Sequence, residues 1–314
     1  MKIFYDIQKL TSEYKNIAVA LGMFDGVHIG HQSIIRRAVE LAKNVDGTSA
    51  VFTFQNHPLS LLSIERENNR GLPKMIGDRK SRRDILEKLG IDLLIEIPFT
   101  REVSQISPVD FVTLLKENLS PRYVVTGSNF TFGHRGAGDQ KMLREYGQQF
   151  GFEAVICQTI LRDGKNVSST RIRRLISEGN LAKANEFLGR EFSYRSTVVH
   201  GFERGRTIGF PTANLEISSK RVMLPVGVYA VKILHDSKIY QGIGNIGNNP
   251  TFEEKIPSRI EVYIDDFSGD LYGQEIEVSF VEKMRDEKKF SNIDELKSQL
   301  QNDLEKMQKI FAKK

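Results

Sequence analysis

The chain is poor in cysteine and has no long apolar stretch. Its one cysteine, Cys157, excludes an intramolecular disulfide, and no Cys/His cluster has the spacing of a zinc site. No uninterrupted apolar run approaches the ~20 residues that cross a bilayer. The start, Met1 to Lys15, also lacks the apolar core of a signal peptide. We therefore expect a cytoplasmic protein with no membrane partner.

Positive and negative charges are nearly balanced, so the net charge is small. The 314 residues include 45 Lys and Arg against 40 Asp and Glu, a net charge of +5. Residues 187–314 carry 19 charges of each sign, so the whole excess lies in the first part. Such an excess fits phosphate-bearing partners. It is diffuse and accompanies no aromatic-interleaved RNA motif, so we expect no nucleic-acid partner.

Before Gly189, short apolar runs alternate with helical patterns. We expect strands at 17–21, 50–54, 93–97, 123–126 and 153–157, with helices from Gln32, over 79–89, from Pro108 and near 140–150. This alternation is typical of βαβ units. It predicts a Rossmann-like α/β domain whose parallel sheet is covered on both faces. Ligands of such sheets bind at the carboxyl ends of the strands.

After Gly189 the pattern changes to short, closely spaced strands. They are expected at 194–200, 227–235, 238–243, 259–265 and 275–281, and Asp236-Ser237 fits a hairpin turn. The pattern predicts a small antiparallel β-barrel, followed by a C-terminal helix over about 292–311 with apolar residues at helical spacing. The boundary near 188–191 gives two domains, 1–187 and 188–314.

A glycine-rich segment with two histidines joins the first strand to the first helix. It runs from Gly22 to His31, and Gly30 lies between His28 and His31. Backbone N–H groups at a helix start favour anions, and glycines let a phosphate approach the main chain. Two imidazole donors could stabilise the charge that grows on phosphate oxygens during nucleotidyl transfer. The alternative is a turn with two solvated histidines.

Two further segments could bind phosphate or a cation. Ser168-Ser169-Thr170-Arg171-Ile172-Arg173 opens a helix, where hydroxyls either cap the helix or help to hold an anion. In the second domain, glycines 201, 205 and 209 precede Pro211-Thr212-Ala213-Asn214. In an extended chain Thr212 and Asn214 point to one face, where their oxygens could meet a hard cation such as Mg²⁺. An ordinary packed loop is the alternative.

These motifs together resemble one family, the bacterial bifunctional riboflavin kinase/FMN adenylyltransferases. The resemblance extends from about Ile17 to the C-terminus. In the first domain it rests on the histidine segment, on SSTRIR, on Phe52-Thr53-Phe54 with His57-Pro58, and on residues 126–133 (TGSNFTFG). In the second it rests on residues 205–215 ending in PTAN, and on 227–230, 245–252 and 271–273.

For the first domain, the resemblance implies that His28 and His31 are catalytic and stabilise the ATP phosphates. The other ATP and phosphate contacts it implies here are Gly22, Phe24, Asp25, Gly30, Ser169, Thr170 and Arg173. The flavin contacts it implies are Phe54, His57, Asn129 and Phe130. Many members of the family carry Asp where this chain has Asn129, so only hydrogen bonding is expected there.

For the second domain, the resemblance implies that Glu261 is the catalytic base that takes the proton from the riboflavin 5′-hydroxyl. Gly205 and Gly209 would surround the ATP phosphates, and Thr212 and Asn214 would ligate Mg²⁺. Arg285 corresponds to a family arginine near the flavin, with a solvated charge cluster as the alternative. There is no P-loop signature, which is consistent with a β-barrel kinase.

The implied enzyme has two steps. The barrel would phosphorylate riboflavin to FMN, and the first domain would adenylylate FMN to FAD and release pyrophosphate. ATP is the co-substrate and Mg²⁺ the cofactor, so the partners are riboflavin, FMN, FAD, ATP and ADP, and self-association stays open. Two alternatives remain, namely loss of one activity and an adenylyltransferase for another small phosphate. The PTAN and NIGNNPTF segments argue against the second.

Overall fold

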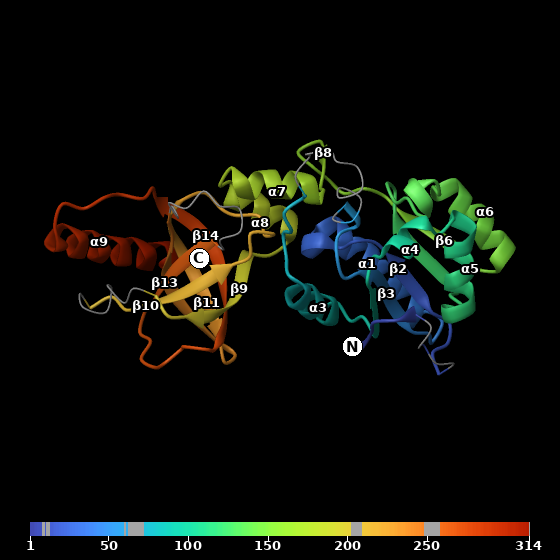
Figure 1. Ribbon diagram of the computed structural model, residues 1–314, viewed down its shortest axis with the longest axis horizontal. Coiled ribbons are helices and arrows are strands. Elements are labelled where there is room, and N and C mark those ends of the chain that lie inside the picture. Colours follow the sequence, from blue (N-terminus) through green and yellow to red (C-terminus); the bar gives the residue numbers. More distant parts are fainter. Residues whose placement is uncertain are drawn as a thin grey trace. The chain divides into compact units, whose positions relative to one another are not determined.

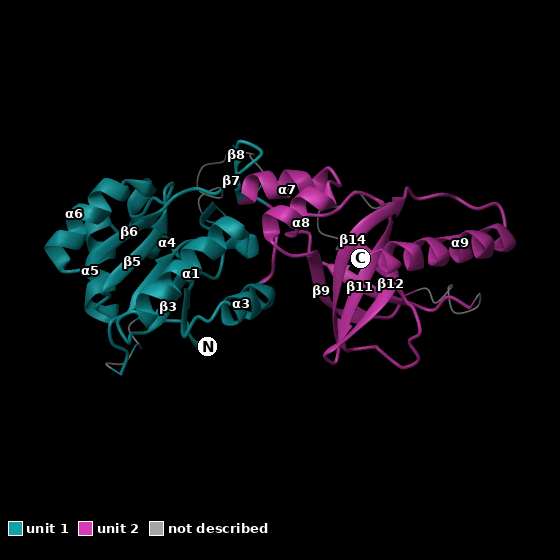
Figure 2. Ribbon diagram, turned by 180° about the vertical axis from the view of Figure 1, so that it is seen from behind, with its two compact units in different colours: residues 1–73, 79–168 teal, residues 74–78, 169–314 magenta. Residues whose placement is uncertain are grey.

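The computed structural model divides the chain into two compact units (Figures 1 and 2). One unit comprises residues 1–73 and 79–168, and the other residues 74–78 and 169–314. The structure describes residues 1–7, 10, 13–59, 61, 72–201, 209–247 and 258–313. Within these ranges, none of the helices is both long and apolar enough to cross a membrane.

The first unit is built on a parallel sheet. In spatial order its strands are β1 (Lys2–Phe4), β4 (Leu93–Ile97), β3 (Ser49–Phe54), β2 (Ala18–Leu21), β5 (Tyr123–Gly127) and β6 (Glu153–Cys157). Every neighbouring pair is parallel. All residues of β2 and β4 are buried, as expected where both faces are covered. Lys2–Phe4 was not among the strands predicted from the sequence.

Helices cover both faces of this sheet. α1 (Ile29–Lys43) and α3 (Arg79–Lys88) share an apolar cluster with Ala18 and Ala20 of β2. α5 (Pro108–Leu119) and α6 (Gln140–Phe150) share a second cluster with Val19 and Leu21. Since successive strand residues point to opposite faces, the two clusters lie on opposite sides of the sheet. The Rossmann-like prediction is therefore confirmed.

Local side chains fix where the helices begin. Ser107 accepts the backbone N–H of Asp110 at 3.2 Å, and Pro108 occupies the first turn of α5. Asp139 accepts the N–H of Met142 at 2.9 Å and so caps α6. Between α4 (Arg101–Gln105) and α6 lies the short turn η3 (His134–Gly136). The caps at Ser107 and Asp139 therefore define the first residues of α5 and α6.

The strand order reverses between β2 and β5. The chain moves outward from β2 through β3 to β4, and then returns to β5 on the other side of β2. In open α/β sheets, ligands bind where the order reverses, outside the carboxyl ends of the strands. The loops after β2, β3 and β5 meet at this edge, which places the predicted first-domain site at a position that suits a ligand.

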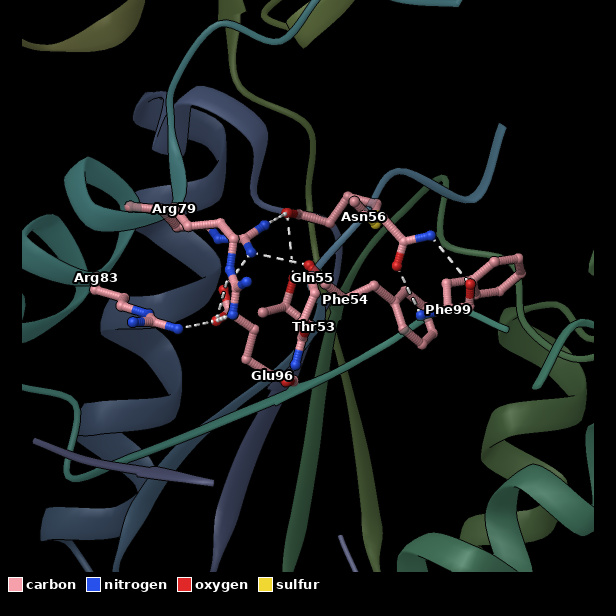
Figure 3. A network of polar contacts seen from close by, with 10 residues as sticks. Thr53, Phe54, Gln55, Asn56, Arg79, Arg83, Glu96 and Phe99 are labelled. Carbon is pink, nitrogen blue, oxygen red and sulfur yellow. Dashed lines mark hydrogen bonds and ion pairs between the residues drawn. The ribbon is translucent and has the colours of Figure 1, made fainter. Parts of the chain in front are cut away.

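A buried carboxylate stands at the same edge. Glu96 in β4 is 0% exposed. It forms ion pairs with Arg79 at 2.7 Å, Arg82 at 2.5 Å and Arg83 at 2.5 Å, all from α3. Figure 3 shows Arg79 and Arg83 pointing at this carboxylate. The ion pairs anchor the first turns of α3 to the sheet.

The second unit contains a closed antiparallel barrel. In order around it are β10 (Thr212–Ile217), β13 (Ser258–Ile264), β12 (Lys238–Ile246), β11 (Gly227–His235), β14 (Glu275–Arg285) and β9 (Phe192–Val199), which pairs with β10. Phe280 packs edge-on against Tyr194 and Tyr229 in the core. Asp236 and Ser237 both have positive φ, as a tight hairpin turn requires. The predicted barrel is confirmed, with β10 as an additional strand.

Helices flank the barrel. α7 (Ser169–Ser177) and α8 (Leu181–Leu188) precede it, and a small hairpin of β7 (Leu161–Arg162) and β8 (Lys165–Asn166) ends the first unit. The C-terminal helix α9 (Ile293–Ala312) packs Met307 and Leu304 against Val228 and Ile243 of the barrel. The predicted C-terminal helix is thus confirmed, and its apolar stripe faces the barrel.

A segment from the first half of the chain belongs to the second unit. Met75 forms a bridge with Arg221, whose side chain is buried. The Arg221 guanidinium donates to the carbonyl of Ile76 at 2.7 Å and pairs with Asp78 at 3.1 Å. It also lies over the ring of Tyr194. Residues 74–78 are therefore fixed to the barrel unit by a buried cation.

Burial alone would raise the pKa of Glu96, but hydrogen bonds from Arg79, Arg83 and Arg82 outweigh it and lower that pKa below its ordinary value of 4.5. The carboxylate therefore contributes stability above pH 4.5, which is lost as the pH falls through the lowered pKa. We expect Glu96→Gln to lower the free energy of unfolding of the first unit by roughly 3 kcal/mol at pH 7. Below pH 4.5 the difference from the wild type should shrink.

Urea unfolding followed from pH 7 to pH 3 measures both effects. Glu117→Gln, an exposed change on α5, is the matched control and should stay within about 0.5 kcal/mol of the wild type. Parallel pH profiles for Glu96→Gln and the wild type would contradict the assignment.

Candidate active sites

The histidine segment connects β2 to α1 through the turn η2 (Asp25–Val27). Phe24, Gly26 and Val27 have φ of 48°, 75° and 36°. Glycine adopts positive φ readily, but for phenylalanine and especially for β-branched valine it is a strained conformation. Strain of this kind persists only where neighbours fix the backbone, and it is concentrated at functional sites.

His28 and His31 come together at the start of α1. Their rings stack with centroids 3.6 Å apart and an interplanar angle of 19°. Nδ1 of His28 accepts the backbone N–H of His31 at 3.2 Å, so His28 caps the helix. In the neutral His28 ring the proton is then on Nε2, which can donate. Together with the helix N-terminus, the pair forms an edge suited to an anion.

The other residues predicted in this segment support the histidines. A Cβ at Gly30 would lie 3.2 Å from the His28 ring, so glycine allows that ring to fold over the helix start. A Cβ at Gly22 would lie 3.0 Å from the ring of Phe24. Phe24 and Asp25 are buried, and Phe24 packs edge-on against His31 with centroids 5.3 Å apart. Phe24 and Asp25 thus shape the loop from within.

The predicted flavin residues follow β3 and β5, the two neighbours of β2. Phe54 and Phe130 are partly buried and pack on the same apolar cluster. Asn129 is exposed beside them in sequence. Nδ1 of His57 accepts the backbone N–H of Leu59 at 3.2 Å. Phe54 ends β3, and His57, Asn129 and Phe130 lie on the loops that follow β3 and β5. All four residues are therefore at the carboxyl edge of the sheet that also carries the histidine pair.

Ser168 is the last residue of the first unit, and the other SSTRIR residues, Ser169 to Arg173, start α7 and belong to the second unit. Ser169 and Arg173 are partly buried, and Thr170 is exposed. Nε of Arg173 donates to the carbonyl of Lys74 at 2.8 Å, so this side chain is tied to the segment 74–78. The histidine pair belongs to the first unit. We therefore describe the histidine pair and the start of α7 separately, each within its own unit.

In the barrel, three polar residues form one row across adjacent strands. Glu261 of β13 stands directly opposite Asn214 of β10 and opposite Asn245 of β12. Opposed residues of antiparallel strands point to the same face. Glu261 is exposed whereas Ile260 and Val262 are buried, so the row lies on the outer face of the barrel. The sequence-predicted Glu261 and Asn214 are thus brought together.

Thr212 lies on the same face of β10, two residues before Asn214 and opposite Tyr263. Asn214 is buried, and a Cβ at Gly201 would come within 2.2 Å of its amide. The chain therefore passes over Asn214 at a point where only glycine fits. Gly209 has φ of 84°, and Gly205 lies outside the described residues.

A pocket of about 510 Å³ opens beside Thr212. Its size is within the range of about 300–1,000 Å³ that is usual for small-molecule sites. The walls are largely apolar, with polar groups from Thr212, Ser268, Asp270 and Tyr272. The apolar part consists mainly of Val198, Pro211, Ala213, Val262, Ile264, Phe267 and Leu271. Such a pocket suits a small molecule with both apolar and polar surface.

Arg285 pairs with the C-terminal helix. Its Nη2 and Nε donate to the buried carboxylate of Asp303, at 2.7 Å and 2.9 Å, and Nη1 donates to the carbonyl of Asp286. The same carboxylate accepts from Gln299 at 2.9 Å. Arg285 therefore joins the end of β14 to α9, and its side chain is not part of the Glu261 row.

Comparison with known proteins decides the family. The family model for FAD synthetase matches residues 10–171, and that for riboflavin kinase matches residues 188–311. A bifunctional riboflavin kinase/FMN adenylyltransferase of Listeria monocytogenes is 37% identical over 305 residues, 96% of each chain. The Bacillus subtilis protein of that name is 35% identical over 96% of this chain and 95% of its own. The chain belongs to the bifunctional riboflavin kinase/FMN adenylyltransferase family.

A solved structure agrees with this fold over the whole chain. It is titled a macrolide-efflux protein from Streptococcus pneumoniae, has a TM-score of 0.85 and 30% sequence identity, and the match covers 98% of both chains. An experimental structure thus has the same fold as this chain over nearly its whole length.

Sequence reasoning assigned no role to Asn245. The residue stands in the NIGNNPTF segment that supports the family resemblance, but its position beside Glu261 depends on the register between β12 and β13. The alternation within each strand shows which residues share a face, but not which residue of β12 stands opposite a given residue of β13. The position of Asn245 opposite Glu261 could therefore be found only from the folded barrel.

The close approach at Gly201 yields a test for the kinase half of the family fold. In Gly201→Ala the added methyl group would overlap the Asn214 amide, so the segment or the amide must move. We expect riboflavin phosphorylation to fall at least about tenfold, because small displacements in a site are costly. FMN adenylylation should change less than about twofold.

Flavin chromatography after incubation with riboflavin or FMN measures both rates. Thr197→Ala, an exposed change on β9, should leave both unchanged. If Gly201→Ala phosphorylated riboflavin at the wild-type rate, the reaction would not depend on the position of Asn214.

Proposed function

We propose that each domain of this family member carries one reaction, with domains 1–187 and 188–314. The barrel phosphorylates riboflavin with ATP to give FMN, and the α/β domain adenylylates FMN with a second ATP to give FAD. The observation that carries the proposal is that each half presents its own chemically suited group, a stacked histidine pair in one and Glu261 between two amides in the other. Because both reactions use ATP, we place the enzyme in the cytoplasm.

In the α/β domain, an FMN phosphate oxygen attacks the α-phosphorus of ATP, and pyrophosphate leaves. The attacking phosphate is already ionised, so no protein base is required. His28 and His31 donate hydrogen bonds to phosphate oxygens as charge grows on them, aided by the N-terminus of α1. Positioning and charge stabilisation supply the catalysis.

The remaining assignments proposed for the first half of the chain follow from the family resemblance. Gly22, Phe24, Asp25 and Gly30 keep the histidine loop in shape beside the ATP phosphates. For Ser169, Thr170 and Arg173, at the start of α7, we propose contacts to ATP phosphate. The isoalloxazine side is lined by Phe54, His57, Asn129 and Phe130, where the neutral Asn129 amide contributes hydrogen bonds.

In the barrel, Glu261 is the general base. It accepts the proton of the riboflavin 5′-hydroxyl while that oxygen attacks the γ-phosphorus, and ADP leaves. An alcohol is a poor nucleophile, so this step needs a base more than the adenylyl step does. Asn214 and Asn245 stand opposite Glu261 on the two neighbouring strands. For Gly205 and Gly209 we propose contacts to the ATP phosphates, and for Arg285 a contact to the flavin, as the family resemblance implies.

The donor set beside Glu261 fits Mg²⁺. Thr212 and Asn214 offer a hydroxyl and an amide oxygen on one strand face, and both are hard oxygen donors. Among the described residues there is no cluster of three or more His, Cys, Asp or Glu that could hold a metal. That agrees with an ion held mainly by substrate phosphates and few protein ligands. When bound, Mg²⁺ would neutralise phosphate charge.

Two variants should separate the activities. Glu261→Gln should lower riboflavin phosphorylation at least about a hundredfold, in line with the contribution of a general base. It should leave adenylylation of added FMN unchanged. The double change His28→Ala, His31→Ala should do the reverse. Chromatography of riboflavin, FMN and FAD after incubation with ATP and Mg²⁺ measures both.

Glu282→Gln, an exposed carboxylate of the same barrel, is the matched control for Glu261 and should not affect either rate. Normal FMN formation by Glu261→Gln would remove the base assignment, and normal FAD formation by the double histidine variant would remove the histidine pair from the site. No flavin turnover by the wild type would overturn the function itself.

A further inference from the structure

The strained histidine loop is fixed at its second residue, Met23, by two buried donors. Nη1 of Arg82 donates to the carbonyl of Met23 at 3.0 Å, and Oγ1 of Thr53 donates to the same carbonyl at 3.2 Å. Thr53 is 1% exposed and Arg82 is 5% exposed. A carbonyl with two donors from different elements has little freedom to turn.

Arg82 itself is fixed by the buried Glu96. Its Nη2 donates to the Glu96 carboxylate at 2.5 Å and to the carbonyl of Phe54 at 2.8 Å. The guanidinium therefore joins β4, the end of β3 and the loop after β2. Arg79 and Arg83 share the same carboxylate, but their described hydrogen bonds do not include the Met23 carbonyl. Among the three arginines, Arg82 is the one that contacts this loop.

The Met23 carbonyl leads directly into the strained part of the loop. The next residue, Phe24, has φ of 48°, and its buried ring packs edge-on against His31. A turn of the Met23–Phe24 peptide would therefore move the ring on which His31 rests. His31 in turn stacks on His28. A continuous set of contacts thus runs from Glu96 through Arg82, Met23 and Phe24 to the histidine pair.

We propose that Arg82 and Thr53 are positioning residues for adenylyl transfer, which hold the Met23 carbonyl so that His28 and His31 keep their stacked arrangement. The inference rests on the proposed role of the histidines in FMN adenylylation. Both residues lie behind the loop, so their contribution reaches the transition state through the histidines. If His28 and His31 are misplaced, kcat should fall because the transition state is less well stabilised. Substrate binding in the ground state, and hence KM, should change little.

The test compares isosteric changes at the two donors. Thr53→Val removes the hydroxyl and keeps the shape, and Thr53→Ser restores the hydroxyl. Arg82→Met removes the guanidinium. We expect kcat for FMN adenylylation to fall about 3- to 10-fold in Thr53→Val and about 10- to 100-fold in Arg82→Met, by the usual cost of misplacement. Thr53→Ser should stay within about twofold, and KM for ATP and FMN within about threefold, in all three.

Two controls accompany these variants. Arg79→Met removes another arginine from Glu96 without touching the loop, and its kcat should stay within about threefold of the wild type. Riboflavin phosphorylation by the same full-length protein checks the barrel, and the stoichiometry of ATP binding checks the folding of the first unit. If Arg82→Met does not fold, the Thr53→Val and Thr53→Ser pair carries the test.

Wild-type kcat in Thr53→Val would overturn the proposal, as would equal losses in Arg82→Met and Arg79→Met. A rise in KM with unchanged kcat would also overturn it, because the residues would then act in substrate binding. If the wild type forms no FAD from FMN, the proposed function fails instead, and the two failures are thereby distinguished.

Discussion

The parallel pairing of β2 with both β3 and β5 is the constraint on which the first unit depends. It places the carboxyl ends of these strands side by side, so the loops that follow them share one edge. The histidine pair, the aromatic residues Phe54 and Phe130, and Asn129 all reach that edge from separate parts of the chain. Hydrogen bonding between backbones thus assembles a site whose side chains are far apart in sequence.

In the barrel, antiparallel strand register brings polar residues from different strands together. Its antiparallel register sets Asn214, Glu261 and Asn245 in one row, and each comes from another strand. The alternation of strand residues then separates this polar row from the aromatic core around Phe280. The polar row and the aromatic core therefore occupy opposite faces of the same strands. A change of register by one residue would move the row into the core.

Much of this could be predicted from the sequence, because the strands and helices of both domains carry strong periodic patterns. The strands at 93–97, 153–157 and 227–235 have the expected bounds, and the parallel sheet and the barrel follow from their order. β1 was missed because Lys2–Phe4 is too short to show a pattern. The placement of Asn245, and the contacts of Arg82 and Arg285, depend on long-range packing that no local pattern encodes.

The segment 74–78 has a consequence for how the two halves could be separated. Because it belongs with the barrel while residues 1–73 and 79–168 belong together, the polypeptide passes between the units three times. A single cut after residue 168 or 187 would therefore remove a piece of the second unit along with the first. The isolated C-terminal fragment would keep Arg221 but lose the Ile76 carbonyl and Asp78 that accept from it. The two units are thus interleaved along the chain, and a clean separation needs both the segment 74–78 and residues 169–314.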